Sequence, residues 1–174
     1  GGCRGRGVKC QRQIFKEANR ELTKEEYMRL LSASQKNHDE RLYLLIKTIC
    51  ATGIRISELP YVTVEAAAQG HAMIYCKNKQ RCILLPQKIC RELTDYAKAA
   101  GYIFRTKSGR PVDRSNAWHA MKRLGREAGV PEDKIFPHNL RHLFARTFYD
   151  TEKDIVRLAD ILGHSSIDTT RIYT

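Results

Sequence analysis

The end of the chain, residues 137–174, carries basic and hydroxyl side chains at separations that helices can fold onto one pocket. His138 and Arg141 are three residues apart, so on a helix they share a face and can point at one anion together. If Pro137 marks the helix start, His138 lies in the first turn, where free backbone N–H groups already favour negative charge. The pattern predicts a helical phosphate site, with an ordinary solvated surface as the alternative.

A second helix is expected over residues 152–162, because its apolar side chains recur at i, i+3, i+4 and i+7: Ile155, Leu158, Ala159 and Leu162. Gly163 ends this helix. His164 therefore follows a helix end and is free to reach a ligand, and Tyr173 comes nine residues later. A structural histidine and a half-buried tyrosine are the alternatives at these two positions.

His138 and His142 also form an H-x-x-x-H pair, which on a helix can hold zinc. No glutamate lies between them as H-E-x-x-H would require, and the spacing shows no third ligand. We therefore expect neither a metal nor another cofactor.

Four short motifs stand in a fixed order: A-T-G-I-R-I-S-E-L at residues 51–59, P-H-N-L-R-H at 137–142, L-G-H-S at 162–165, and the closing Tyr173. They resemble, in order and spacing, the boxes of the tyrosine recombinases, also called the phage integrase family. The resemblance runs from about Leu22 to Thr174.

The resemblance implies an α+β fold, a mainly helical catalytic domain with a small antiparallel β-sheet or hairpin. This domain is expected over residues 23–174, after a basic linker or flexible segment at residues 1–22. The implied activity is site-specific recombination of double-stranded DNA through a 3′-phosphotyrosyl intermediate, independent of metal and ATP. The resemblance also implies that the protein assembles as a homo-tetramer on DNA. The expected role is the integration or excision of a mobile element.

The family's catalytic positions carry over onto six residues of this chain: Arg55, Lys77, His138, Arg141, His164 and Tyr173. Tyr173 is the implied nucleophile, and the hairpin lysine is the implied general acid. The hairpin is shorter than the family's G-K-G-N-K-E-R pattern, so Lys79 is kept as a reserve for Lys77. Glu58 is expected to orient Arg55 through a salt bridge, with an exposed helical carboxylate as the alternative.

Composition agrees with this assignment. A chain of 174 residues with 42% hydrophobic residues is long and apolar enough for one domain with a core. The net charge of +12 favours a polyanionic partner such as nucleic acid. No apolar run approaches a membrane span and no signal peptide is evident, so a cytoplasmic protein that does not associate with membranes is expected. Six cysteines without a C-x-x-C pair indicate reduced thiols.

Local patterns predict the remaining elements. Thr23 and Glu26 form a capping box before a helix. Further helices are expected at residues 39–52, 88–99 and, after the cap Asp113, to about Ala128. Core positions in these helices are Leu42, Leu45, Ile46, Ile49, Trp118, Met121 and Leu124. Runs at 61–64, 72–76 and 82–85 are prone to form strands, with a turn at 77–80.

Several further cations are candidates for contacts with the DNA backbone, a charged solvated face being the alternative: Arg105, Lys107, Arg110, Arg114, Lys122 and Arg123. Two other functions stay open. One is a type IB topoisomerase, which uses the same tyrosine chemistry. The other is a catalytically impaired DNA-binding fragment, because the sequence ends one residue after Tyr173. The oligomeric state of the chain without DNA, for which a monomer is one expectation, is open as well.

Overall fold

The structure is a computed structural model that describes residues 21–149. The predicted helix at 152–162, the basic segment before residue 21, His164 and Tyr173 lie outside the described residues.

Helix α2 (Lys24–Lys36) begins with the predicted capping box. The Thr23 hydroxyl accepts from the Glu26 backbone at 3.1 Å, and the Thr23 backbone donates to Oε1 of Glu26 at 3.0 Å. Helix α3 (Glu40–Thr52) is capped by Asp39, whose Oδ1 accepts from the Leu42 backbone at 3.1 Å. It ends at Gly53, whose φ of 70° is left-handed and therefore suits glycine. Both predicted helix starts are confirmed.

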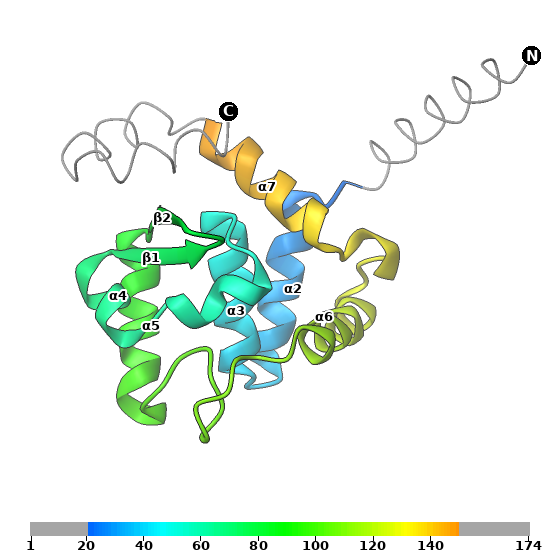
Figure 1. The fold of residues 1–174 in the computed structure, drawn as a ribbon. Coiled ribbons are helices and arrows are strands. Elements are labelled where there is room, and N and C mark those ends of the chain that lie inside the picture. Colours follow the sequence, from blue (N-terminus) through cyan, green and yellow to red (C-terminus); the bar gives the residue numbers. More distant parts are fainter. Residues whose placement is uncertain (1–20, 150–174) are drawn as a thin grey trace, which may run out of the picture.

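Helix α3 lies at the centre of the fold (Figure 1) and packs against α2, α5 (Gln87–Ala100), α6 (Arg114–Ala128) and α7 (Pro137–Tyr149). It is apolar on most sides, and the predicted stripe is buried: Leu42, Leu45, Ile46 and Ile49. Met121 and Leu124 of α6 are buried as expected, while Trp118 is half-buried against the same core. The end of α3 is thereby held rigidly, and the chain that leaves it forms part of the site described below.

The segment after α3 differs from the prediction. Residues 61–64 were expected as a β-prone run, but Tyr61 ends the 3₁₀ helix η1 (Ile56–Tyr61) and Val64 begins helix α4 (Val64–Gln69). The Thr63 hydroxyl accepts from the Ala66 backbone at 3.1 Å and caps α4. The strand propensity of these residues is overridden because a local cap satisfies the helix start.

Two antiparallel strands form the β-hairpin, β1 (His71–Cys76) and β2 (Lys79–Leu84). Cys76 pairs with Lys79, so the turn is the two residues Lys77 and Asn78, with φ of 47° and 63°, rather than the predicted four. Left-handed conformations at both turn residues match the twist of a hairpin, which explains why one residue fewer than the family pattern suffices. The predicted hairpin is confirmed and its turn is corrected.

The second half of the fold is helical. Helix α5 ends at Gly101, α6 begins after its cap Asp113, and α7 begins at Pro137 after the short 3₁₀ helix η2 (Glu132–Lys134). The described residues thus form a mostly helical domain with one small antiparallel sheet, as the fold prediction stated. Between residues 21 and 149, no helix is long and apolar enough to cross a membrane.

Removal of the α6 cap provides a test of this local analysis. Oδ1 of Asp113 accepts from the Asn116 backbone at 2.9 Å. Asp113→Ala should lower the free energy of unfolding by about 1 kcal/mol, the usual contribution of such a cap. Asp95→Ala is the control, because Asp95 makes only a 4.0 Å ion pair with both side chains 76% exposed. Urea unfolding should show a change below about 0.5 kcal/mol for that control, and equal changes in both variants would contradict the capping role.

Candidate phosphate-binding site

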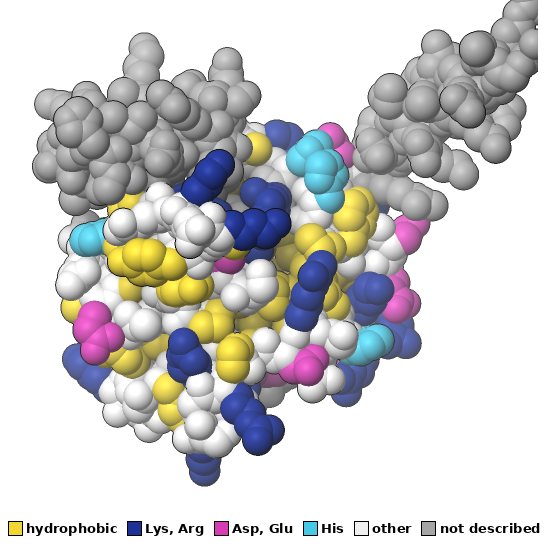
Figure 2. Space-filling model, in the orientation of Figure 1, with side chains coloured by type: hydrophobic (Ala, Val, Ile, Leu, Met, Phe, Trp, Pro, Cys, Tyr) yellow, Lys and Arg dark blue, Asp and Glu magenta, His cyan; other side chains and the backbone are white. Residues whose placement is uncertain are grey.

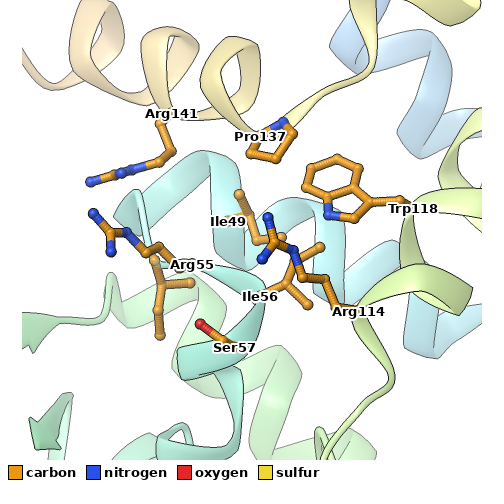
Figure 3. Close-up of a pocket in the computed structure, with 9 residues that line it drawn as sticks. Ile49, Arg55, Ile56, Ser57, Arg114, Trp118, Pro137 and Arg141 are labelled. Atoms are coloured by element: carbon orange, nitrogen blue, oxygen red, sulfur yellow. The ribbon is translucent and has the colours of Figure 1, made fainter. Parts of the chain in front are cut away.

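A pocket of about 280 Å³ lies where the end of α3, the start of η1, α6 and α7 meet. Its lining combines apolar residues with arginines: Ile49, Ile54, Arg55, Ile56, Ser57, Arg114, Trp118, Pro137 and Arg141. Figure 3 shows Arg141 reaching down from α7 and Arg55 reaching up from the turn before η1, with their guanidinium groups on the same side of the pocket. The structure therefore brings together Arg55 and Arg141, which are far apart in sequence.

Arg55 is presented by a short turn with buried flanks. Its backbone is extended, with φ −82° and ψ 151°, and its neighbours Ile54 and Ile56 are 0% and 5% exposed. The Arg55 backbone N–H donates to Oε1 of Glu58 at 3.0 Å. Because the two isoleucines and this hydrogen bond fix the backbone, the exposed Arg55 side chain points outward into the pocket.

Arg141 is positioned by the packing of α7. Its neighbours Asn139 and Leu140 are buried, and Nδ2 of Asn139 donates to the Lys134 carbonyl at 2.8 Å. The Arg141 side chain is partly buried, and its Nε–H is buried without a hydrogen-bond partner among the described residues. A buried donor left unsatisfied costs about 1–3 kcal/mol. An anion in the pocket would remove that cost, since guanidinium groups bind phosphate oxygens with two parallel hydrogen bonds.

Helix α6 adds a second side of the pocket, which the sequence patterns do not indicate. Arg114 and Trp118 are four residues apart and so lie on one face of α6. Figure 3 shows the Arg114 side chain beside the indole ring. The Trp118 Nε1–H is also buried without a partner in residues 21–149. The i, i+4 spacing is the sequence signal for this shared face, whereas the patterns taken singly predict a DNA-backbone contact for Arg114 and a core position for Trp118.

The site is strongly cationic. Among the residues that the structure describes, its lining includes three arginines and no carboxylate. On the face drawn in Figure 2, several Lys and Arg side chains gather in the upper middle, whereas Asp and Glu lie mainly toward the edges. Because like charges in a concave site are stabilised by a bound anion, the pocket suits a phosphate group.

Glu58 does not make the expected salt bridge with Arg55 within the described part of the chain. The residue is 6% exposed, and its carboxylate accepts from both terminal nitrogens of Arg81 in β2, at 2.8 and 2.7 Å. It supports Arg55 through the backbone N–H instead. Sequence spacing missed Arg81, because this partner lies 23 residues further along the chain.

His138 is exposed and does not line this pocket, although it shares α7 with Arg141. The centroid of its ring lies 4.1 Å from the ring centroid of His142. Its ring also stacks on the Phe136 ring, with the two centroids 6.4 Å apart. No group of three or more potential metal ligands occurs in residues 21–149. The structure thus places His138 next to Pro137 of the lining and about one helical turn from Arg141, but outside the lining itself.

Both candidate lysines are exposed at the hairpin end and are not part of the pocket lining. Lys77 lies in the two-residue turn. Lys79 is two residues before Arg81 in β2, so the two side chains emerge on the same face of the sheet. Because Arg81 points to η1, Lys79 lies on the η1 side and Lys77 at the tip.

The other predicted DNA-backbone contacts do not line the pocket. Arg105 donates to the Gly109 carbonyl at 2.9 Å within its own loop, where Lys107 and Arg110 are exposed. Arg123 follows Arg114 by nine residues, which is about two and a half turns of helix, so it lies on the opposite side of α6. Lys122 is partly buried. Among the six, only Arg114 contributes to the pocket.

A sequence profile described as the Phage integrase family matches residues 20–174. The chain belongs to the phage integrase family. The match covers the described domain and the motifs on both of its arginine-bearing segments. It also extends over residues 150–174, where His164 and Tyr173 lie.

Relatives of this phage integrase family chain are named as recombinases. Tyrosine recombinase XerH of Campylobacter jejuni is 30% identical over 167 residues, covering 88% of this chain and 47% of that protein. Tyrosine recombinase XerA of Pyrococcus furiosus is 31% identical over 174 residues, covering 93% and 59%. The chain thus spans about half the length of these curated relatives. Their names do not confirm the mobile-element setting expected from the sequence.

Solved structures agree with the fold. A crystal structure of XerA recombinase superposes with a TM-score of 0.65 at 28% identity, covering 88% of this chain and 58% of that chain. The lambda integrase catalytic core superposes with a TM-score of 0.59 at 18% identity, covering 75% and 84%, a likeness of fold alone. A type IB topoisomerase is not favoured, because the relatives and structures named above are recombinases and an integrase.

Proposed function

We propose that this chain is the catalytic part of a site-specific DNA recombinase, which cuts and rejoins DNA strands through a 3′-phosphotyrosyl intermediate. The observation that carries the proposal is the convergence of Arg55 and Arg141 in one pocket of a phage integrase family chain. Two arginines that share one phosphate can neutralise both of its nonbridging oxygens. That is the main electrostatic requirement of a transfer to and from DNA phosphorus.

The chemistry is an exchange of phosphodiester bonds. The Tyr173 phenol oxygen attacks a DNA phosphorus, a P–O bond to tyrosine forms, and the P–O bond to the 5′-oxygen breaks. The hairpin lysine, Lys77 or its reserve Lys79, gives a proton to that leaving 5′-oxygen. A 5′-hydroxyl of a second strand later reverses the step. One phosphodiester bond replaces another at each stage, so no ATP is consumed.

Arg55, Arg141 and His164 are proposed to bind the nonbridging oxygens as charge develops. His138 is proposed to position or accept the phenolic proton, acting from the same helix as Arg141 once DNA and Tyr173 are in place. A phenol with an ordinary pKa near 10 is mostly protonated at neutral pH, so it requires such a group or a strong positive field. The cationic pocket supplies that field.

Double-stranded DNA is the proposed partner. A net charge of +12 favours a polyanion, and a XerH structure 26% identical to this chain is bound to its difH substrate. We place the protein in the cytoplasm, with its DNA. Assembly into a tetramer on two duplexes, and action on a mobile element, stay predictions; sedimentation of the DNA complex tests the first.

Covalent trapping tests the proposed function directly. The chain is incubated with a pool of nicked duplexes that carry a randomised core, and protein-linked DNA is recovered on a denaturing gel. The nick lets the cleaved segment diffuse away, so the phosphotyrosyl link accumulates. We expect an adduct that survives denaturant and high salt and forms equally in EDTA, because arginines replace the metal ions of other phosphoryl-transfer sites.

The duplex recovered in the adduct, called the selected duplex, is then used to distinguish the candidate functions. Joining of strands from two different duplexes indicates recombination, whereas relaxation of a supercoiled plasmid without strand exchange indicates topoisomerase activity. Noncovalent binding to the pool without any adduct would contradict the proposal and leave a DNA-binding fragment. An adduct abolished by EDTA would contradict the metal-independent scheme.

A further inference from the structure

The β-hairpin is joined to the Arg55 turn by a partly buried ion pair. In it, Nη1 of Arg81 donates to Oε2 of Glu58 at 2.8 Å, and Nη2 donates to Oε1 at 2.7 Å. The two side chains are only 20% and 8% exposed. Two parallel charge-assisted bonds fix orientation as well as distance. We call this pair, Arg81 with Glu58, the clasp.

The Glu58 carboxylate binds two segments of the chain at once. While the clasp binds β2, Oε1 of Glu58 also accepts the Arg55 backbone N–H at 3.0 Å. One carboxylate therefore fixes both the strand that leads to the hairpin lysines and the backbone that presents an arginine to the pocket. The spacing between Arg55 and the hairpin tip depends on this carboxylate.

The clasp acts close to the tip. Arg81 pairs with Ile74 across the sheet, and Lys79 lies two residues nearer the turn on the same face. A strand rises about 3.3 Å per residue, so the clasp lies about 7 Å along β2 from Lys79. Lys77 follows in a turn of only two residues with defined left-handed backbone angles. Because the intervening strand and turn are short and regular, the position of Arg81 constrains the position of either lysine.

The second link between η1 and the hairpin is weaker. The Tyr61 hydroxyl donates to the Tyr75 carbonyl at 3.0 Å, but the two residues are 37% and 58% exposed, so water competes for this bond. Both terminal nitrogens of Arg81 bind Glu58, and its buried Nε–H has no other partner within residues 21–149. Its guanidinium is committed to Glu58 and is not available for DNA.

We propose that Arg81 is a positioning residue for protonation of the leaving group: through the clasp it holds the hairpin lysine where its proton can reach the DNA 5′-oxygen. The inference rests on the proposed function. Arg81 itself touches neither DNA nor the reacting atoms. Its effect is confined to the step in which the P–O5′ bond breaks and the lysine proton moves to O5′.

A sulfur substitution isolates this step. When the 5′-bridging oxygen of the scissile phosphate is replaced by sulfur, the leaving group is a thiolate. Thiols ionise near pH 8.5, far more readily than alcohols, so this group departs without a proton donor. Each variant is assayed on the oxygen and the sulfur form of the selected nicked duplex. The ratio of the two adduct rates is independent of how much protein is folded.

Arg81→Met should lower the rate on the oxygen substrate by about 10–100-fold, part of the 10²–10⁴-fold that a positioned general acid supplies. Its rate on the sulfur substrate should stay within about twofold of wild type. Lys77→Ala, or Lys79→Ala if that is the donor, should show the same pattern with a larger ratio. Arg81→Lys should recover part of the oxygen rate, because it retains one charged hydrogen bond.

The matched control is Lys47→Met. Lys47 forms a comparable partly buried ion pair with Glu92 at 2.5 Å, with 14% and 26% exposure, joining α3 to α5. Its removal should leave the sulfur-to-oxygen ratio unchanged. Glu58→Ala should lower both rates, because the Arg55 backbone then also loses its acceptor. Equal losses on the two substrates in Arg81→Met would overturn the inference and leave the proposed function intact. A wild-type chain that forms no adduct on either substrate would overturn both.

A second measurement is independent of DNA. Cys76 is exposed at the end of β1, next to Lys77, whereas the other described cysteines are buried. A spin label on Cys76, with Cys3 and Cys10 changed to serine, reports the mobility of the tip. Arg81→Met should increase that mobility and Lys47→Met should not. An unchanged spectrum in Arg81→Met would mean that the clasp does not hold the hairpin, and would overturn the inference.

Discussion

Arg141→Ala should lower the single-turnover rate of adduct formation by about 10²–10³-fold, the usual cost of removing one donor to a developing oxyanion. The guanidinium is partly buried, lines the pocket, and leaves one N–H without a partner in the described domain, so its geometry is already set for an anion. Arg55→Ala should have an effect of similar size. The rate is measured on the selected nicked duplex at saturating protein, so that weaker binding does not enter.

The double variant tests whether the two arginines serve one phosphate. Groups that act on the same charge are coupled, so Arg55→Ala combined with Arg141→Ala should lose less than the product of the single effects. Two arginines that bound separate phosphates would instead give additive free energies. Arg141→Lys should remain well below wild type, because an ammonium group lacks the planar fork that holds two oxygens.

Arg123→Ala is the matched control for net charge. Arg123 is exposed on the side of α6 opposite Arg114, so its removal takes away one positive charge without touching the pocket. We expect a rate within about twofold of wild type and, at most, a slightly weaker salt-dependent affinity. A loss equal to that of Arg141→Ala would show that the pocket has no special role.

The helices that carry the site could be predicted because their ends are encoded locally. Asp39, Asp113 and Pro137 mark starts, and Gly53 and Gly101 mark ends, and the structure confirms each of these. Caps act within three or four residues, so sequence spacing contains the whole interaction. The same kind of local pattern predicts helix α7 and places Arg141 on a defined turn of it.

Interactions between distant segments could not be predicted this way. Glu58 was assigned to Arg55, three residues away, but its carboxylate binds Arg81, because the hairpin folds back over η1. The run at 61–64 was read as β-prone, yet Thr63 caps a helix there. In both cases the local pattern admitted two outcomes, and the packing of a later segment or a competing cap decided between them.

The contribution of α6 to the pocket shows the same limit. Trp118 was expected in the core and Arg114 on the DNA backbone, and each expectation describes only one side of these residues. The indole packs against the core while its edge lines the pocket beside Arg114. Burial patterns along one helix identify the face that is covered. They do not identify which element covers the border of that face, and here it is α7 and the turn before η1.

Tyr173→Phe should abolish the covalent adduct entirely, because phenylalanine has no oxygen to form the phosphotyrosyl bond. Noncovalent binding of the same duplex should stay within about threefold of wild type, since loss of one hydroxyl removes at most one hydrogen bond of about 0.5–1.5 kcal/mol. The two readouts come from one incubation, a denaturing gel for the adduct and a native gel for the complex. Loss of both would indicate a folding or docking defect instead of a missing nucleophile.

The matched control is another tyrosine, Tyr96 on α5, which does not line the arginine pocket. Burial raises the pKa of Tyr96 on α5, so that phenol stays protonated well above neutral pH. Burial also raises the pKa of Tyr27 on α2, for the same reason. Tyr96→Phe should therefore form the adduct at the wild-type rate. An adduct that persisted in Tyr173→Phe and disappeared in Tyr96→Phe would reassign the nucleophile, and peptide mapping of the DNA-linked tyrosine would identify it. An adduct linked to Tyr173 would connect the arginine pocket on the described domain to the chemistry proposed for it.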